Sequence, residues 1–201
     1  MDLSEKVGSW VYGTRVYRKE DFMKKLYFAR HGQTVWNAEN KICGATDIPL
    51  TALGHEQAEE LGRLIAAEDY GIDEILYSPL RRAADTARHI HETTGIPLRE
   101  EPRLKEQNFG KWESTPRDGA AFQAAKAQFV NRNQGGESMM QMAQRIYNLL
   151  DELKAQSQEK SYLLVAHNGI ARIVQSYFYD MTNEEFAAFG IGNCQVLEYE
   201  W

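Results

Sequence analysis

The order of apolar and polar segments in this chain of 201 residues predicts an α/β fold. We expect a three-layer α/β/α sandwich, with a mostly parallel sheet and helices on both faces. Short apolar runs at 26–29, 73–77 and 162–166 are typical of strands buried on both sides. Each run is followed by a segment with apolar residues at helical spacing, and no internal repeat interrupts the alternation. The length is that of one domain.

The first strand opens the predicted domain. Met23 and two lysines precede the apolar run, so we predict the domain over residues 23–201. Residues 1–22 mix charges with aromatic side chains and are predicted to be an N-terminal extension. The sequence leaves its role open: it is dispensable, or residues 10–17 add an edge strand or a packed arm. Such an arm could serve a dimer, so monomer and homodimer are both expected forms.

The first half of the domain continues with two helices and two strands. Thr51 is expected to cap a helix whose apolar side carries Leu61, Leu64 and Ile65. The strand at 73–77 leads into a helix with one small-residue face, and residues 97–99 form another short strand. The predicted face of that second helix consists of Ala83, Thr86, Ala87 and Ile90.

The second half repeats the pattern. A glycine turn at 135–136 precedes an amphipathic helix, the strand at 162–166 precedes another, and residues 196–201 close the chain as a strand. Thr182 and Glu185 form a capping box for a short helix between them. The buried stripes are expected to be Met139, Met142, Ile146, Leu149, Leu150 and Leu153 in the first helix, and Ile170, Ile173, Val174, Tyr177 and Phe178 in the second.

Composition and charge narrow the functional class. The formal net charge of −6 argues against nucleic acid or an anionic membrane as a partner, because both need a basic face. Cys43 and Cys194 lie far apart without a CxxC pattern, so reduced thiols in a cytoplasmic protein are expected, with a disulfide as the alternative. No apolar run approaches the length of a membrane span or resembles a secretion signal.

Cationic side chains follow three of the predicted strands. Arg30 and His31 end the first, Arg81 and Arg82 follow the second, and His167 follows the strand at 162–166. Ligands of parallel sheets bind at the carboxyl ends of strands, so these groups are expected to converge on one anion. A phosphoryl group fits best, because its transfer demands positioning and neutralisation of charge. One of the two adjacent arginines is expected to face the site and the other the solvent.

Other polar residues have plainer interpretations. His55 is interpreted as a solvated surface histidine, and Glu106, taken alone, as a solvated loop residue. His89 and His91 are two positions apart, so they point to different sides of a helix and do not suggest a metal pair.

Four ordered motifs resemble the histidine phosphatase superfamily, in its phosphoglycerate-mutase-like branch. The resemblance runs from about residue 24 to the end of the chain. The motifs are Arg30-His31-Gly32-Gln33-Thr34-x-x-Asn37, Ser78-Pro79-Leu80-Arg81-Arg82-Ala83-x-x-Thr86-Ala87, Leu104-x-Glu106-x-x-Phe109-Gly110-x-Trp112-Glu113 and Ala166-His167-Asn168-Gly169. Many relatives have two glycines after the second histidine, whereas Asn168 here brings a side chain near the pocket.

The resemblance implies a role for each matching position. His31 is the expected nucleophile that becomes phosphohistidine, and Glu106 the expected proton donor. The phosphoryl oxygens are expected to be held by Arg30, Arg82 and His167, with Asn37, Thr34 and Asn168 completing the pocket. No metal and no cofactor is expected. The substrate body is expected to contact the loop around Cys43, Gly44 and Thr46, the segment after Trp112, and the region around Asn193.

The sequence leaves four functions open. The motifs after Glu106 resemble those of broad-specificity and alpha-ribazole phosphatases, and the segment 112–135 is shorter than in mutases that exclude water. A phosphomonoesterase acting on a small phosphorylated metabolite is therefore the favoured expectation, and a phosphoglycerate-type mutase is the alternative. A non-catalytic phosphate-binding module and a zinc hydrolase using His31 and His167 are the remaining alternatives.

Overall fold

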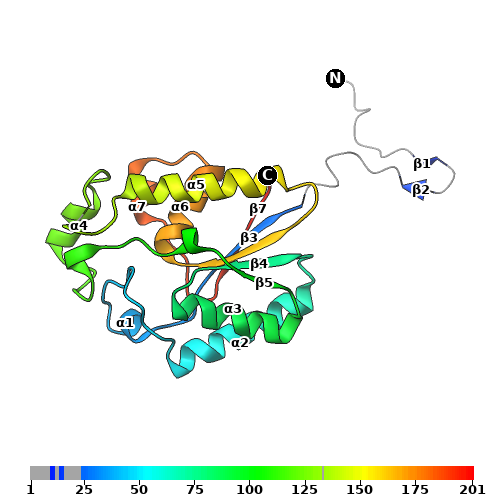
Figure 1. The fold of residues 1–201 in the computed structure, drawn as a ribbon, viewed down its shortest axis with the longest axis horizontal. Coiled ribbons are helices and arrows are strands. Elements are labelled where there is room, and N and C mark those ends of the chain that lie inside the picture. The colour runs from blue at the N-terminus through cyan, green and yellow to red at the C-terminus, as the bar shows by residue number, and fades with distance from the viewer. Residues whose placement is uncertain (1–9, 12–13, 16–23, 133) are drawn as a thin grey trace, which may run out of the picture.

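Five strands form one sheet, which confirms the predicted α/β class. The computed structural model describes residues 10–11, 14–15, 24–132 and 134–201. The strand order is β5-β4-β6-β3-β7, and β7 alone among these strands runs antiparallel to its neighbour, β3 (Figure 1). The strands are β3 (Leu26–Arg30), β4 (Glu74–Tyr77), β5 (Leu98–Glu100), β6 (Tyr162–Ala166) and β7 (Val196–Tyr199).

Helices cover both faces of the sheet, so the three predicted layers are present (Figure 1). Side chains alternate along each strand. Phe28 and Leu164 pack with α5 (Met139–Ala155) and α6 (Asn168–Phe178), while Ala29 and Val165 pack on the opposite face. That second face is covered by α2 (Ala52–Glu68) and α3 (Arg81–Thr94).

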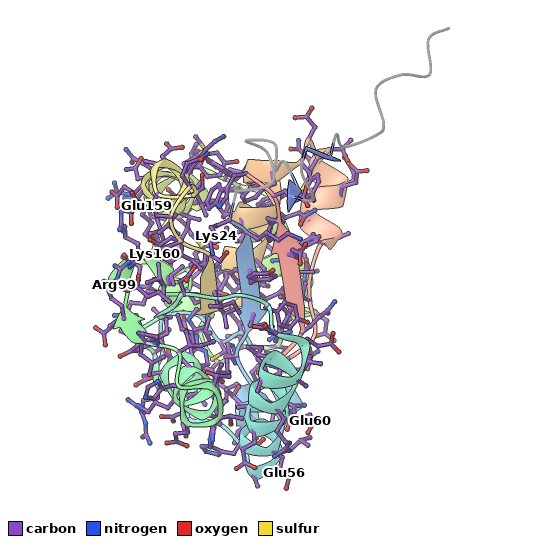
Figure 2. The ribbon with its side chains drawn as sticks, turned by 90° about the vertical axis from the view of Figure 1, so that its right-hand side faces the viewer. Lys24, Glu56, Glu60, Arg99, Glu159 and Lys160 are labelled. Atoms are coloured by element: carbon purple, nitrogen blue, oxygen red, sulfur yellow. The ribbon has the colours of Figure 1, made fainter. Side chains whose placement is uncertain are left out.

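The cap predicted at Thr51 is present, and Ser138 caps a second long helix without having been predicted to do so. Thr51 accepts a hydrogen bond from the Gly54 amide at the start of α2, and Ser138 forms a capping box at the start of α5. The prediction for α2 was wrong in one position, because Leu64 is 42% exposed while Leu61 and Ile65 are buried. Figure 2 shows Glu56 and Glu60 of the same helix pointing away from the sheet.

Short elements gather at the end of the sheet where β3, β4 and β6 finish. They are α1 (Val35–Ala38), the 3-10 helices η2 (Pro102–Leu104) and η3 (Gly110–Trp112), α4 (Ala120–Lys126) and α7 (Asn183–Ala188). Figure 1 shows α1 and α4 beyond this end, so loops and short helices join the first turns of α3 and α6 around the strand ends.

Charged side chains lie near the edge of the sheet that β5 forms. Glu74 on β4 accepts from the Arg99 Nε of β5 at 2.9 Å and from the Lys160 Nζ at 3.4 Å. Figure 2 shows Arg99 and Lys160 on the same side of the molecule. Charged side chains at an edge strand disfavour pairing with another chain.

Within the extension, β1 (Trp10–Val11) and β2 (Thr14–Arg15) pair antiparallel in a sheet of their own. These two strands do not extend the five-stranded sheet as an edge strand would. The rest of residues 1–22 lies outside the described residues, so the predicted boundary of the domain stays a prediction. Among the described residues, no helix is both long and apolar enough to cross a bilayer.

We expect Leu164→Ala to lower the free energy of unfolding by ~2–5 kcal/mol, because it leaves a cavity in the central strand β6. Leu164 is fully buried, packed among the side chains under α5 and α6. Urea unfolding followed by circular dichroism measures the change. Leu64→Ala on α2 is the matched control and should change the free energy by less than ~1 kcal/mol. Equal losses in the two variants would contradict this assignment of the core.

Candidate active site

A pocket lies where β3 and β6 end. The strand order reverses between these two strands, which is where parallel sheets bind ligands. The space has a volume of about 550 Å³, counting the part open to solvent. Arg30, His31, Asn37, Glu106 and Asn168 are among the residues that line it.

His31 directly follows β3 and is only 3% exposed. Its backbone N–H donates to the Ala166 carbonyl of β6 at 3.0 Å, which ties the two strand ends together. The ring Nδ1 lies 2.7 Å from the Gly32 carbonyl oxygen, and a carbonyl can only accept. The proton therefore sits on Nδ1, and Nε2 keeps its lone pair.

The electrostatic surroundings keep His31 neutral. Burial lowers the pKa of its imidazole well below the ordinary value, and the positive charges of Arg82 and Arg30 lower it further. A histidine that is unprotonated at neutral pH, with a free Nε2, is in the state that a nucleophile requires.

The turn after His31 is pressed against the two helices α2 and α3. A Cβ on Gly32 would come within 2.3 Å of the Gly54 carbonyl oxygen of α2, so only glycine fits. The Gly32 amide donates to Thr86 Oγ1 of α3 at 3.1 Å. This packing fixes the backbone on which His31 is carried.

Arg30 carries an unsatisfied donor beside His31. Its Nη1 donates to the Ile191 carbonyl at 2.6 Å, while its Nε is buried and has no hydrogen-bond partner among the described residues. Burial and the neighbouring Arg117 lower the pKa of this guanidinium to about 10, so it stays charged at neutral pH. The Nη2 of Arg30 also has no hydrogen-bond partner among the described residues, and because Arg30 lines the pocket this group can donate to a ligand oxygen.

Arg82 and His167 form a buried pair next to His31. Arg82 Nε donates to His167 Nδ1 at 3.2 Å, so the His167 proton is on Nε2, which donates to Ser78 Oγ at 2.7 Å. The rings of His31 and His167 are 5.1 Å apart. Arg82 is fully buried, whereas Arg81 is exposed and is the one of the two arginines that faces the solvent.

The loop at 44–46 holds the guanidinium of Arg82. Its Nη1 donates to the Thr46 carbonyl at 2.9 Å and its Nη2 to the Gly44 carbonyl at 2.7 Å. The carboxylate of Glu113 in turn accepts from the amides of Gly44, Ala45 and Thr46 at 3.0–3.3 Å. Glu113 therefore positions the loop that positions Arg82.

Glu106 is buried, only 6% exposed, so its interpretation as a solvated loop residue was wrong. Its Oε1 accepts from the Gln107 amide and its Oε2 from the Gly169 amide, both at 2.9 Å. A Cβ on Gly169 would lie 2.4 Å from Oε1, so the glycine makes room for the carboxylate. Glu106 and His31 thus face the same pocket from different segments.

Neutral polar groups complete the rim. Asn37 lines the pocket, and its Oδ1 accepts from the Thr34 amide at 3.1 Å. Asn193 Nδ2 donates to the His31 carbonyl at 2.8 Å. Asn168 Oδ1 accepts from the Ile191 amide at 2.9 Å. The Nδ2 groups of Asn37 and Asn168 have no hydrogen-bond partner among the described residues and can donate to a ligand.

The far wall of the pocket contains cations that the sequence analysis did not identify. Arg117, Lys126 and Arg172 line it together with the rings of Phe109 and Phe122, which are 5.5 Å apart. Burial lowers the pKa of Lys126 to about 8, and the charges of Arg172 and Arg117 contribute. Two features of the sequence could have pointed to these cations. Arg117 and Lys126 are basic residues in the segment after Trp112, and Arg172 lies one helical turn after Asn168.

The structure divides the predicted site residues into two groups. Arg30, His31, Asn37, Cys43, Glu106 and Asn168 line the pocket. The other predicted residues are not among the lining residues: Thr34 bonds to Asn37 of the lining, and Arg82 bonds to Gly44, Thr46 and His167. The phosphate-binding and substrate-binding roles of both groups remain predictions.

The remaining histidines and the two cysteines lie in surroundings that can be compared with the predictions made for them. His55 is not simply solvated: its Nδ1 lies 2.9 Å from His89 Nε2, across α2 and α3. Within the described parts of the chain, no three His, Cys, Asp or Glu side chains are grouped so that they could hold a metal ion. Cys43 and Cys194 are free thiols.

Comparison with known sequences places the chain in a family. The sequence profile of the histidine phosphatase superfamily (branch 1) matches residues 26–201. A "Probable phosphoglycerate mutase GpmB" of Yersinia pestis (strain Pestoides F) is 34% identical over 152 residues, 72% of this chain and 70% of that protein. The same protein of Yersinia pseudotuberculosis matches to the same extent.

Solved structures with this fold include phosphatases. A mycobacterial glucosyl-3-phosphoglycerate phosphatase, solved with VO3, is similar with a TM-score of 0.75 and 28% identity, covering 87% of this chain and 90% of that one. A candidate alpha-ribazole-5'-P phosphatase of Escherichia coli str. K-12 is similar with a TM-score of 0.74 and 26% identity, covering 87% and 89%. The chain belongs to the histidine phosphatase superfamily (branch 1), an enzyme family of phosphoryl transfer, as its four motifs predicted.

Proposed function

We propose that this enzyme hydrolyses phosphomonoesters of a small metabolite through a phosphohistidine at His31, without a metal ion. The observation that carries the proposal is that a neutral His31 and Arg30, whose Nη2 has no hydrogen-bond partner among the described residues, line the same pocket. The imidazole supplies a lone pair, and the guanidinium supplies a donor that lacks an acceptor. A phosphoryl group bound between them satisfies both.

In the first step, Nε2 of His31 attacks phosphorus and the ester P–O bond breaks. The carboxyl group of Glu106 gives its proton to the leaving oxygen, which departs as the alcohol. The imidazole becomes positively charged, and the Gly32 carbonyl, 2.7 Å from Nδ1, stabilises that charge. The positive charges of Arg30 and Arg82 offset the negative charge on the phosphoryl oxygens.

In the second step, the Glu106 carboxylate takes a proton from water as the water oxygen attacks phosphorus. The P–N bond breaks, inorganic phosphate leaves, and His31 returns to its neutral form. Glu106 is thereby protonated again, so each turnover consumes one water and restores the enzyme.

Access of water favours hydrolysis over transfer back to the substrate. The pocket is open to solvent, and a structural neighbour that binds VO3 is named as a phosphatase. The sequence relatives named as probable phosphoglycerate mutases keep a mutase as the second candidate, with the same first step. The free thiols of Cys43 and Cys194 are consistent with the cytoplasmic location that we propose.

We expect the native chain to release inorganic phosphate from a panel of phosphomonoesters in the presence of EDTA, and His31→Ala to release none, because the nucleophile is gone. A malachite-green assay measures the phosphate. His91→Ala, an exposed histidine on α3, is the matched control and should retain activity. Activity that is lost with EDTA, or that survives in His31→Ala, would contradict the mechanism.

We expect Glu106→Gln to slow turnover by ~100- to 10,000-fold, because an amide cannot supply the proton. The phosphorylated His31 should remain detectable by intact-protein mass spectrometry when the substrate has a leaving group that needs no proton. Glu159→Gln, at an exposed position, is the control. Unchanged turnover in Glu106→Gln would remove this residue from the mechanism.

A further inference from the structure

The pocket carries more positive charge than one phosphoryl group requires. Besides Arg30, it is lined by Arg117, Lys126 and Arg172, which come from the turn before α4, the end of α4 and helix α6. Glu106 is the carboxylate among the lining residues that the structure describes. In the mechanism above, these three additional cations have no task.

Two of the three cations donate to backbone carbonyls. Arg117 Nη2 donates to the Lys41 carbonyl at 3.0 Å, and Arg172 Nε donates to the Phe189 carbonyl at 2.7 Å. The remaining guanidinium nitrogens, and Lys126 Nζ, have no hydrogen bond or ion pair with any described residue. The two arginines are thus positioned by the scaffold with donors to spare.

Their mutual repulsion is offset only in part, by the carboxylate of Glu106. Burial lowers the pKa of Lys126 to about 8, with the charges of Arg172 and Arg117 as further causes, while Glu106 acts in the opposite direction. Burial likewise lowers the pKa of Arg172. Like charges gathered in a half-buried pocket disfavour one another, and a bound anion reverses that effect.

We infer that Arg117, Lys126 and Arg172 bind a second anionic group of the substrate, a carboxylate or a second phosphoryl group, while the scissile phosphoryl group lies at His31. This inference rests on the proposed function in one respect, the placement of the first phosphoryl group. The substrate class is therefore a small phosphate ester with a second negative charge.

A competing explanation is that these cations merely attract any anion into the pocket. Attraction of that kind acts on net charge at long range and falls steeply with salt. A binding subsite instead distinguishes esters of similar shape that differ in one group, and does so at physiological salt. The two explanations can be separated with matched ligands.

The test uses His31→Ala protein, so that esters bind without turnover, and isothermal titration calorimetry at physiological salt. The probes are glycerol phosphate, phosphoglycerate, in which a carboxylate replaces the hydroxymethyl group, and a propanediol bisphosphate. Lys126→Met is added to the His31→Ala background. Lys111→Met is the matched control, since Lys111 lies in the same segment, over the Trp112 ring, and does not line the pocket.

We expect phosphoglycerate, the bisphosphate, or both to bind at least ~10-fold more tightly than glycerol phosphate, and Lys126→Met to remove most of that advantage. Lys126→Met should change glycerol phosphate binding by less than ~2-fold, which also shows that the pocket is intact. Lys126→Arg should restore the preference, and Lys111→Met should leave it unchanged. The better of the two doubly anionic probes identifies the second group.

Equal affinity for all three esters, equal loss of all three in Lys126→Met, or no binding of any ester would overturn the inference. Because binding is measured without chemistry, a failure of hydrolysis in the native enzyme leaves this test decisive. Conversely, hydrolysis of glycerol phosphate with no preference for a second charge would support the proposed function and refute the second subsite.

Discussion

The buried charge of Arg82 is the constraint on which the rest of the site depends. A guanidinium with no exposed surface is costly unless its N–H groups are satisfied. Here the acceptors are the Gly44 and Thr46 carbonyls and the His167 ring. The loop that supplies the carbonyls is held by the Glu113 carboxylate. One side chain on α3 therefore connects the end of β6 with two loops that are distant in sequence.

The same positive charges serve two ends in this arrangement. Arg82 and Arg30 lower the pKa of His31, which keeps the imidazole unprotonated, and they also provide the field that a phosphoryl group needs. Burial alone would give a neutral histidine in an apolar environment that repels phosphate. If the same cations were exposed to water, the solvent would weaken their effect on the pKa of His31 and their attraction for an anion. Burial and charge together produce a neutral histidine beside positively charged side chains, which is the state that the proposed nucleophile requires.

The sequence predicted the parts of this structure that depend on neighbouring residues. Apolar runs that end abruptly in Arg30 and His31, or in His167, marked both the strands and the site, because strand and charge are adjacent in the chain. Burial of Glu106 was not predictable in this way, since the amide of Gly169 that holds it is 63 positions away. The pairing of His55 with His89 likewise needs two helices packed together. The spacing of apolar residues along the chain carries no information about contacts between segments that are distant in sequence.

The pocket wall that carries Arg117 and Lys126 is attached to the rest of the molecule through a loop, whereas His31 is attached to paired strands of the sheet. It meets the loop after α1 through the Arg117 amide and the Asn40 carbonyl, 3.0 Å apart, and through an isolated bridge between Lys41 and Pro116. His31 is instead fixed by the β3–β6 pairing in the core of the sheet. The wall and His31 are therefore held by separate sets of contacts, so a substitution in the wall leaves the contacts that fix the His31 backbone in place.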